Sequence, residues 1–142
     1  MTTKQPSCDE RLQEHLTGRI KDLQTLWALE SSGSEDGDPD LGTLNEYGLG
    51  FDYVPAKTFR DEQDEGYFRY QLSWGGPSDE FRFFVDADYA VHRIEYWFLD
   101  WFDGAHRVLR GAQRDLLDNI WDYLTISGDA EYIRGLIQQA TR

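Results

Sequence analysis

The hydrophobic residues of this chain follow a helical period near both ends and an alternating period in the middle. In the N-terminal part, apolar residues recur at steps of three or four, which places them on one helix face. Ser7 and Glu10 have the spacing of a capping box. Together these features predict an amphipathic helix over residues 9–29. Its apolar stripe consists of Leu12, Leu16, Ile20, Leu23 and Trp27.

Apolar and polar residues alternate in four central segments, which is typical of β-strands. The segments are 47–53, 68–74, 81–85 and 91–99. Short turn signals such as Gly75–Ser78 separate them, and short turns join antiparallel neighbours. The pattern predicts a four-stranded antiparallel β-meander.

Two further amphipathic segments, 109–124 and 130–140, are separated by Ser127-Gly128-Asp129 and predict two C-terminal helices. The resulting order is one helix, four strands and two helices. This predicts an α+β fold in which the helices pack mainly on one face of the sheet. The length of 142 residues predicts one domain over 1–142. Residues 1–6 are expected to be a loose tail, and residues 30–41 an acidic flexible linker.

The charge balance excludes several classes of function. There are 27 Asp and Glu against 14 Lys and Arg, a net charge of −13, so we expect neither direct nucleic-acid binding nor docking on anionic lipid. No apolar run is long enough to span a membrane, and Met1–Asp9 lacks the apolar core of a secretory signal. The single cysteine, Cys8, fits a reducing cytoplasm. The 21 aromatic residues (8 Phe, 8 Tyr and 5 Trp) argue against disorder, because aromatic side chains bury large areas.

One segment combines histidines with carboxylates. Asp100 and Asp103 could serve as paired carboxylates, with His92 or His106 as a general base. The two aspartates also follow the end of a predicted strand, where Asp commonly caps turns. The sequence lacks a phosphate-binding glycine loop and the ligand spacing of a metal site, so we expect no enzyme activity, no cofactor and no bound metal.

The predicted turns carry acidic residues in groups, and we identify these groups as candidate partner-binding residues. Acids at every second strand position lie about 6–7 Å apart, close to the spacing of phosphates along one DNA strand. An acidic sheet edge could therefore imitate a nucleic-acid backbone. Plain solubility and adaptation to high salt are alternative explanations of the acidity. The candidates are Asp61, Glu62, Asp64, Glu65, Asp79, Glu80, Asp86, Asp88, Asp100 and Asp103, with Trp97 and Trp101 as aromatic anchors.

Segments 44–53, 66–84 and 96–105 resemble small uncharacterised accessory proteins of bacterial plasmids and phages. The resemblance covers about the middle half of the chain. Such proteins are similar in size, charge and setting to anti-restriction and anti-CRISPR inhibitors, some of which act as DNA mimics. That class shares no sequence motif, so the resemblance transfers no residue role.

The leading hypothesis is a non-enzymatic acidic inhibitor of a basic nucleic-acid-binding protein, such as a nuclease or a restriction or CRISPR effector. An alternative is a cytosolic immunity protein or antitoxin that neutralises a cognate toxin. A third is a small hydrolase or ligand-binding domain that uses His92, Asp100, Asp103 or His106. An exposed edge strand or the face that bears Trp97 could also support a homodimer.

Overall fold

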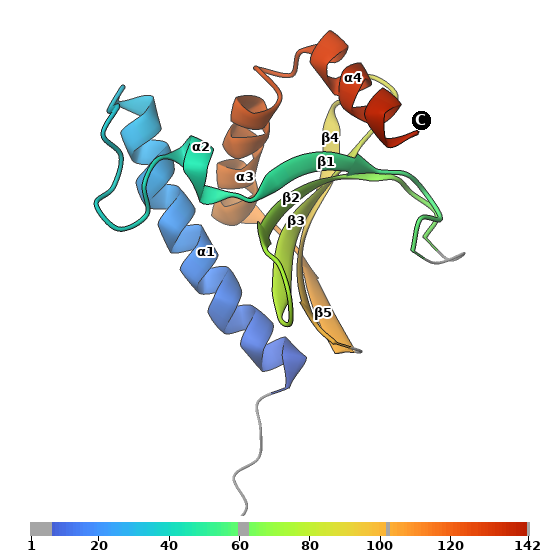
Figure 1. The fold of residues 1–142 in the computed structure, drawn as a ribbon, viewed down its shortest axis with the longest axis horizontal. Helices are drawn as coiled ribbons and strands as arrows, with labels where there is room; N and C mark the ends of the chain where they lie inside the picture. Colours follow the sequence, from blue (N-terminus) through green and yellow to red (C-terminus); the bar gives the residue numbers. More distant parts are fainter. Residues whose placement is uncertain (1–6, 60–62, 102, 142) are drawn as a thin grey trace, which may run out of the picture.

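The computed structural model describes residues 7–59, 63–101 and 103–141, which form an α+β fold with five strands and four helices (Figure 1). Helix α1 begins at a serine cap, because the Ser7 side chain accepts a hydrogen bond from the Glu10 amide. The elements, in order, are α1 (Cys8–Ser31), α2 (Leu44–Tyr47), β1 (Gly50–Val54), β2 (Tyr67–Ser73), β3 (Ser78–Val85), β4 (Val91–Asp100), β5 (Asp103–Val108), α3 (Gly111–Leu124) and α4 (Ala130–Ala140).

The five strands form one antiparallel sheet in which every strand pairs with its sequence neighbour, in the order β1-β2-β3-β4-β5. The meander is confirmed, but it has five strands rather than the four predicted. The additional strand, β5, pairs with β4 from Asp100 opposite Asp103 to Glu95 opposite Val108. Its segment contains few apolar residues because it lies at the edge of the sheet, so the alternation that revealed the other strands is weak here.

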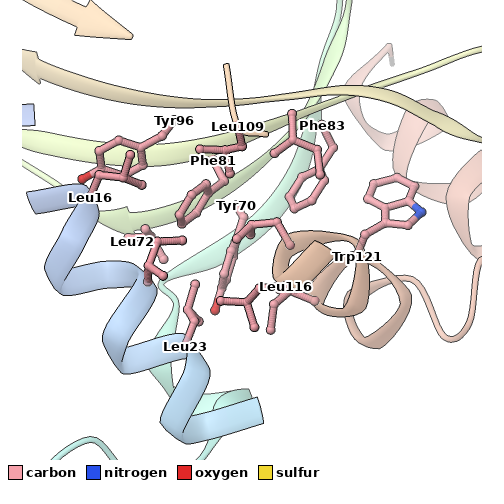
Figure 2. Packing of buried hydrophobic residues seen from close by; sticks show 14 of the residues in the cluster. Leu16, Leu23, Tyr70, Leu72, Phe81, Phe83, Tyr96, Leu109, Leu116 and Trp121 are labelled. Atoms are coloured by element: carbon pink, nitrogen blue, oxygen red, sulfur yellow. The ribbon is translucent and has the colours of Figure 1, made fainter. Parts of the chain in front are cut away.

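One face of the sheet is covered by the helices. Helix α1 contacts β4 and β5, α3 contacts β4, and α4 contacts β1. Figure 1 shows α1 and α3 on the same side of the curved sheet, and Figure 2 shows their leucines meeting the aromatic residues of the strands. Trp121 of α3 lies within about 6 Å of the rings of Phe51, Phe68 and Phe83, measured between centroids. The helix residues and the inward strand residues therefore form one continuous core.

The opposite face of the sheet has a separate and smaller cluster of buried apolar residues. It consists of Val54, Tyr67 and Phe84, all from strands. Among the described residues, no helical residue belongs to this cluster. We call this side the open face, and the site described below lies on it.

Several predicted boundaries change. Tyr47, predicted to begin the first strand, ends the short helix α2, whose capping box joins Thr43 and Glu46. Helix α1 continues to Ser31, into the predicted linker 30–41, and Asp38 within that linker forms an isolated bridge with Gly42, which follows it. Helix α1 begins at the buried Cys8, one residue before the predicted start. The predicted tail, 1–6, lies outside the described residues. Among those described, no helix is long and apolar enough to cross a membrane.

Candidate functional site: a groove on the open face

The open face holds a groove of about 980 Å³, which we call the open-face groove. Its floor consists of the outward side chains of β2, β3 and β4. Its two ends are formed by the connection before β2 and by the turns that join β2 to β3 and β4 to β5. The lining residues are Phe59, Gln63, Asp64, Glu65, Tyr67, Arg69, Trp74, Gly75, Gly76, Ser78, Glu80, Arg82, Phe84, Arg93, Glu95, Trp97, Leu99 and Trp101.

Four flat groups from four successive strands stack on the open face, and the first three of them line the groove. The guanidinium carbon of Arg82 lies 4.4 Å from the ring centroid of Tyr67 and 3.9 Å from that of Trp97. The Trp97 ring lies 4.3 Å from the ring of His106 and almost parallel to it, at 9°. We call the series Tyr67, Arg82, Trp97 and His106 the stacked ladder. Cation–π contacts of this kind hold a guanidinium in a fixed plane.

Carboxylates and guanidinium groups are mixed along the groove. Glu80 Oε2 accepts from Arg82 Nε at 2.7 Å. Glu95 accepts from Arg93 Nε and from Trp97 Nε1, both at 2.9 Å. Both glutamates are buried, so these contacts compensate charges removed from water. The described lining contains four carboxylates and three guanidinium groups, and it is therefore nearly neutral although the chain as a whole is strongly acidic.

Large aromatic side chains stand exposed at the ends of the groove. Trp74 is 77% exposed, Trp101 is 84% exposed and Phe59 is 61% exposed. Trp101 has a φ of 56°, in the left-handed region that large side chains rarely adopt. Its indole lies against the β2–β3 turn, because a Cβ at Gly76 would lie 3.1 Å from Trp101 Nε1. Neither burial nor easy backbone geometry explains a tryptophan at position 101.

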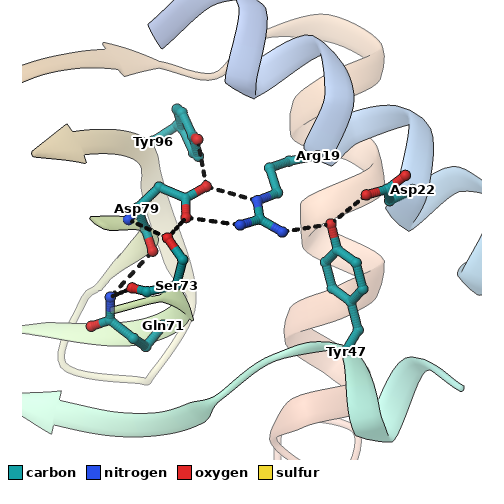
Figure 3. A network of polar contacts seen from close by, with 7 residues as sticks. All are labelled: Arg19, Asp22, Tyr47, Gln71, Ser73, Asp79 and Tyr96. Carbon is teal, nitrogen blue, oxygen red and sulfur yellow. Dashed lines mark hydrogen bonds and ion pairs between the residues drawn. The ribbon is translucent and has the colours of Figure 1, made fainter. Parts of the chain in front are cut away.

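A polar network on the helix-covered face holds α1 against the sheet (Figure 3). Arg19 donates to both carboxylate oxygens of Asp79, at 2.7 and 3.0 Å. Asp79 also accepts from the hydroxyls of Tyr96 and Ser73, and Arg19 donates to Tyr47. Burial alone would raise the pKa of Asp79, but the hydrogen bonds from Arg19, Ser73 and Tyr96 outweigh it and hold that pKa below its usual range. The network is therefore a buried structural tie.

The structure places two predicted partner-binding acids, Asp79 and Glu80, inside the protein. They are 1% and 3% exposed and are consecutive in β3, so they project to opposite faces. Asp79 binds Arg19 in the core, whereas Glu80 binds Arg82 in the groove. Neither carboxylate contributes to an exposed acidic surface.

Other predicted acids also have partners within the chain. Glu65, at the groove end, lies 3.0 Å from Arg93 and 3.5 Å from His92. Asp100 pairs with Arg11 of α1. Two further predicted acids cap turns: Asp86 accepts from the amides of Asp88 and Ala90, and Asp103 accepts from the Gly104 amide. Asp64 and Asp88 are exposed. Asp61 and Glu62 lie outside the described residues.

The structure places the predicted paired carboxylates, Asp100 and Asp103, opposite each other on β4 and β5, but neither candidate general base joins them as a catalytic cluster. His92 and Asp100 lie near opposite ends of β4, about 26 Å apart along an extended strand. His106 stacks on Trp97 on the open face, whereas Asp100 pairs with Arg11 on the other face. Within the described ranges, no three His, Cys, Asp or Glu side chains are grouped so as to hold a metal ion.

The predicted anchors Trp97 and Trp101 both line the groove, one in its floor and one at its end. Glu80, predicted as a partner-binding acid, also lines the groove, whereas the sequence-based prediction did not include Arg82 and Tyr67. Strand alternation already places Arg82 on the same face as Glu80, but the ladder depends on how the strands are aligned, which alternation does not specify.

Comparisons of this chain with protein-family models, curated protein sequences and solved structures found no match. The geometry of the open-face groove is therefore the basis for the functional argument.

Proposed function

We propose that this chain is a non-enzymatic binding protein that inhibits a basic, nucleic-acid-binding protein by engaging it through the open-face groove. The observation that carries the proposal is Trp101, which is 84% exposed and has a backbone φ of 56°. A large apolar residue that is neither buried nor conformationally favoured is understandable if it becomes buried in a complex. Tryptophan is also among the residues most enriched at the energetic centres of protein interfaces.

The net charge of −13 supports a basic partner, because opposite charge accelerates association and disfavours acidic competitors. The paired and buried acids change the form of this hypothesis. Literal mimicry of DNA would require a row of exposed carboxylates, whereas Asp79, Glu80 and Asp100 are each bound by an arginine. We therefore assign the contact to the aromatic groove and the attraction at a distance to the acidic surface. An immunity protein or antitoxin would use the same physical features. The identity of the captured partner would distinguish it from an inhibitor of a restriction or CRISPR effector.

The test is capture of partners from a bacterial lysate on three immobilised forms of the protein. These are the wild type, the double variant Trp74→Ser/Trp101→Ser, and the control Leu49→Ala. Leu49 is 64% exposed but does not line the groove. Capture is carried out at about 0.05 M and about 0.5 M salt, since salt screens the electrostatic attraction.

We expect the wild type and the Leu49 variant to retain the same basic nucleic-acid-binding protein, with less retained at high salt. The tryptophan double variant should lose it. The purified partner should then lose its nuclease or nucleic-acid-binding activity when wild-type protein is added. Equal retention by all three forms, or retention of no basic protein by any of them, would contradict the proposal.

A further inference from the structure

Arg82 is held unusually firmly for an arginine in a groove. Its guanidinium lies between the rings of Tyr67 and Trp97, and its Nε donates to Glu80. Its side chain is 13% exposed. Both faces of the guanidinium are covered and one edge is fixed, so the remaining edge is oriented before any ligand arrives. Preorganisation of this kind lowers the entropic cost of binding.

The terminal nitrogens of Arg82 have no acceptor among the described residues, in contrast to those of the two neighbouring arginines. Arg69 is bound through Nε and a terminal nitrogen to both oxygens of Asp52. Arg93 uses Nε for Glu95 and a terminal nitrogen for Glu65. A guanidinium carries five N–H donors, and within the described ranges Arg82 uses only the one on Nε. Four donors on a largely buried cation therefore remain for an acceptor in the groove.

Tyr67, which stacks on Arg82 in the groove floor, carries a second unused donor. Tyr67 is 1% exposed, and its hydroxyl has no hydrogen-bond partner among the described residues. Burial raises the pKa of Tyr67 to about 12, so the hydroxyl keeps its proton at neutral pH. Buried polar groups normally have partners, and of the two unpartnered buried hydroxyls in the described part of the chain, those of Tyr67 and Tyr70, only that of Tyr67 belongs to a residue lining the groove.

We propose that the open-face groove is a receptor for a carboxylate attached to an aromatic or other apolar group, with the terminal nitrogens of Arg82 as its bidentate donors. The planar fork of arginine matches the two oxygens of a carboxylate. A singly charged carboxylate fits better than a phosphate dianion, because the buried Glu80 and Glu95 lie in the same groove. The apolar part of the ligand would contact Leu99 and an edge of Trp97, since Arg82 and His106 stack on the faces of that indole. This inference concerns the same groove as the proposed function, but it requires no protein partner.

The carboxylate could come from a free small acid or from the end of a peptide chain. The test therefore uses phenylacetate and N-acetyl-alanyl-phenylalanine as the two carboxylate probes. Two control compounds keep the aromatic ring but lack the negative charge: phenylacetamide is neutral, and phenethylammonium is positively charged. Binding is followed by the NMR shift of the Trp97 indole N–H as each probe is titrated into the full-length protein.

We expect saturable binding of at least one carboxylate probe. Phenylacetamide should bind at least about tenfold more weakly than that probe, because the charge-assisted pair with Arg82 is lost. Tighter binding of the peptide acid assigns the carboxylate to a chain end, and tighter binding of phenylacetate assigns it to a free acid. Arg82→Gln should abolish binding. Glu80→Gln, which keeps Arg82 and removes a neighbouring negative charge, should strengthen it.

Two further variants keep the test interpretable. Arg107→Gln removes an arginine on the helix-covered face and should leave the affinity unchanged. Glu80→Gln/Arg82→Gln removes both members of the buried pair, so it avoids an unpaired carboxylate and should fold without binding. The proposal is overturned if neither carboxylate shifts Trp97, if phenylacetamide binds as well as phenylacetate, or if Arg82→Gln keeps the wild-type affinity. Preference for phenethylammonium would also overturn it, yet would leave the proposed capture of a basic protein intact.

Discussion

Arg82 and Trp97 lie face to face on neighbouring strands, with the guanidinium carbon 3.9 Å from the centroid of the indole ring. The same indole stacks on His106 and donates through Nε1 to Glu95. Trp97 thus links the cation, the imidazole and a buried carboxylate in the floor of the groove. Its role in folding differs from that of the exposed Trp101.

Replacement of Trp97 by leucine should lower the free energy of unfolding by about 1–3 kcal/mol, because it removes two stacking contacts and one hydrogen bond to a buried carboxylate. Trp97→Phe should cost less, since it keeps a ring. The measurement is urea unfolding followed by circular dichroism. Equal stability of the leucine variant and the wild type would show that the stacked ladder contributes nothing to folding.

Trp101→Gly should leave the free energy of unfolding unchanged or raise it by up to about 1 kcal/mol, because glycine adopts a positive φ without steric cost. Trp101 has a φ of 56° and is 84% exposed, so little packing is lost. The same variant should weaken partner capture. A fall of more than about 1 kcal/mol in stability would instead assign Trp101 to the folded core.

Asp79→Asn should destabilise the protein by about 2–4 kcal/mol, because it leaves the partly buried Arg19 without its carboxylate. Arg19→Met should cost a similar amount, since it leaves a buried carboxylate with only neutral donors. The double variant should cost less than the sum of the two single changes. A double-mutant cycle by chemical denaturation measures this coupling, and strict additivity would contradict the tie between α1 and the sheet.

The depressed pKa of Asp79 predicts an acid limit to stability. Burial opposes the charged form, but Arg19, Ser73 and Tyr96 stabilise it, so the folded-state pKa lies below that of the unfolded chain. The contribution is complete well above the unfolded pKa of about 4 and is lost as the pH falls through the folded pKa. The stability gap between wild type and Asp79→Asn should therefore narrow below about pH 4. A gap that stays constant with pH would exclude this linkage.

The buried tyrosines predict that the folded protein loses stability at high pH. Burial raises the pKa of Tyr47 and of Tyr67 to about 12, and burial with the nearby Asp79 carboxylate also raises that of Tyr96. Tyrosine in the unfolded chain ionises near pH 10, so this stability is complete below about 10 and is lost above it. In a pH titration, part of the tyrosinate absorbance should appear only together with unfolding. If every tyrosine ionised near pH 10 in the folded protein, these groups would not be buried as described.

The sequence predicted those elements whose apolar residues repeat with a clear period. Helix α4 matches its prediction over 130–140, and Ile94, Tyr96 and Phe98 face the core as the alternation in β4 required. Strand β5 was missed because an edge strand needs few apolar residues. The helix at Leu44–Tyr47 was missed although Thr43 and Glu46 have capping-box spacing, since the strand-like alternation that follows includes Tyr47.

The site was harder to predict than the fold. Alternation assigned Arg93, Glu95 and Trp97 to one face, which is correct. It could not predict that Arg82 lies between Tyr67 and Trp97, because that depends on the alignment of three strands. In the structure, Arg82 is opposite Arg69 on one side and Glu95 on the other, a register that the sequence pattern of a single strand does not specify. Likewise, no local pattern distinguishes the buried Asp79 from the exposed acids in the turns.

The adjacent carboxylates of Asp79 and Glu80 also limit how the sheet can assemble. A slip of β3 by one residue would turn Asp79 toward the groove and Glu80 toward the helices. Asp79 would then leave Arg19 at the same moment that Glu80 left Arg82, so two buried charges would lose their partners. Breaking either buried pair alone costs several kcal/mol. The two ion pairs, one on each face of β3, thus disfavour a shifted register of this central strand during folding.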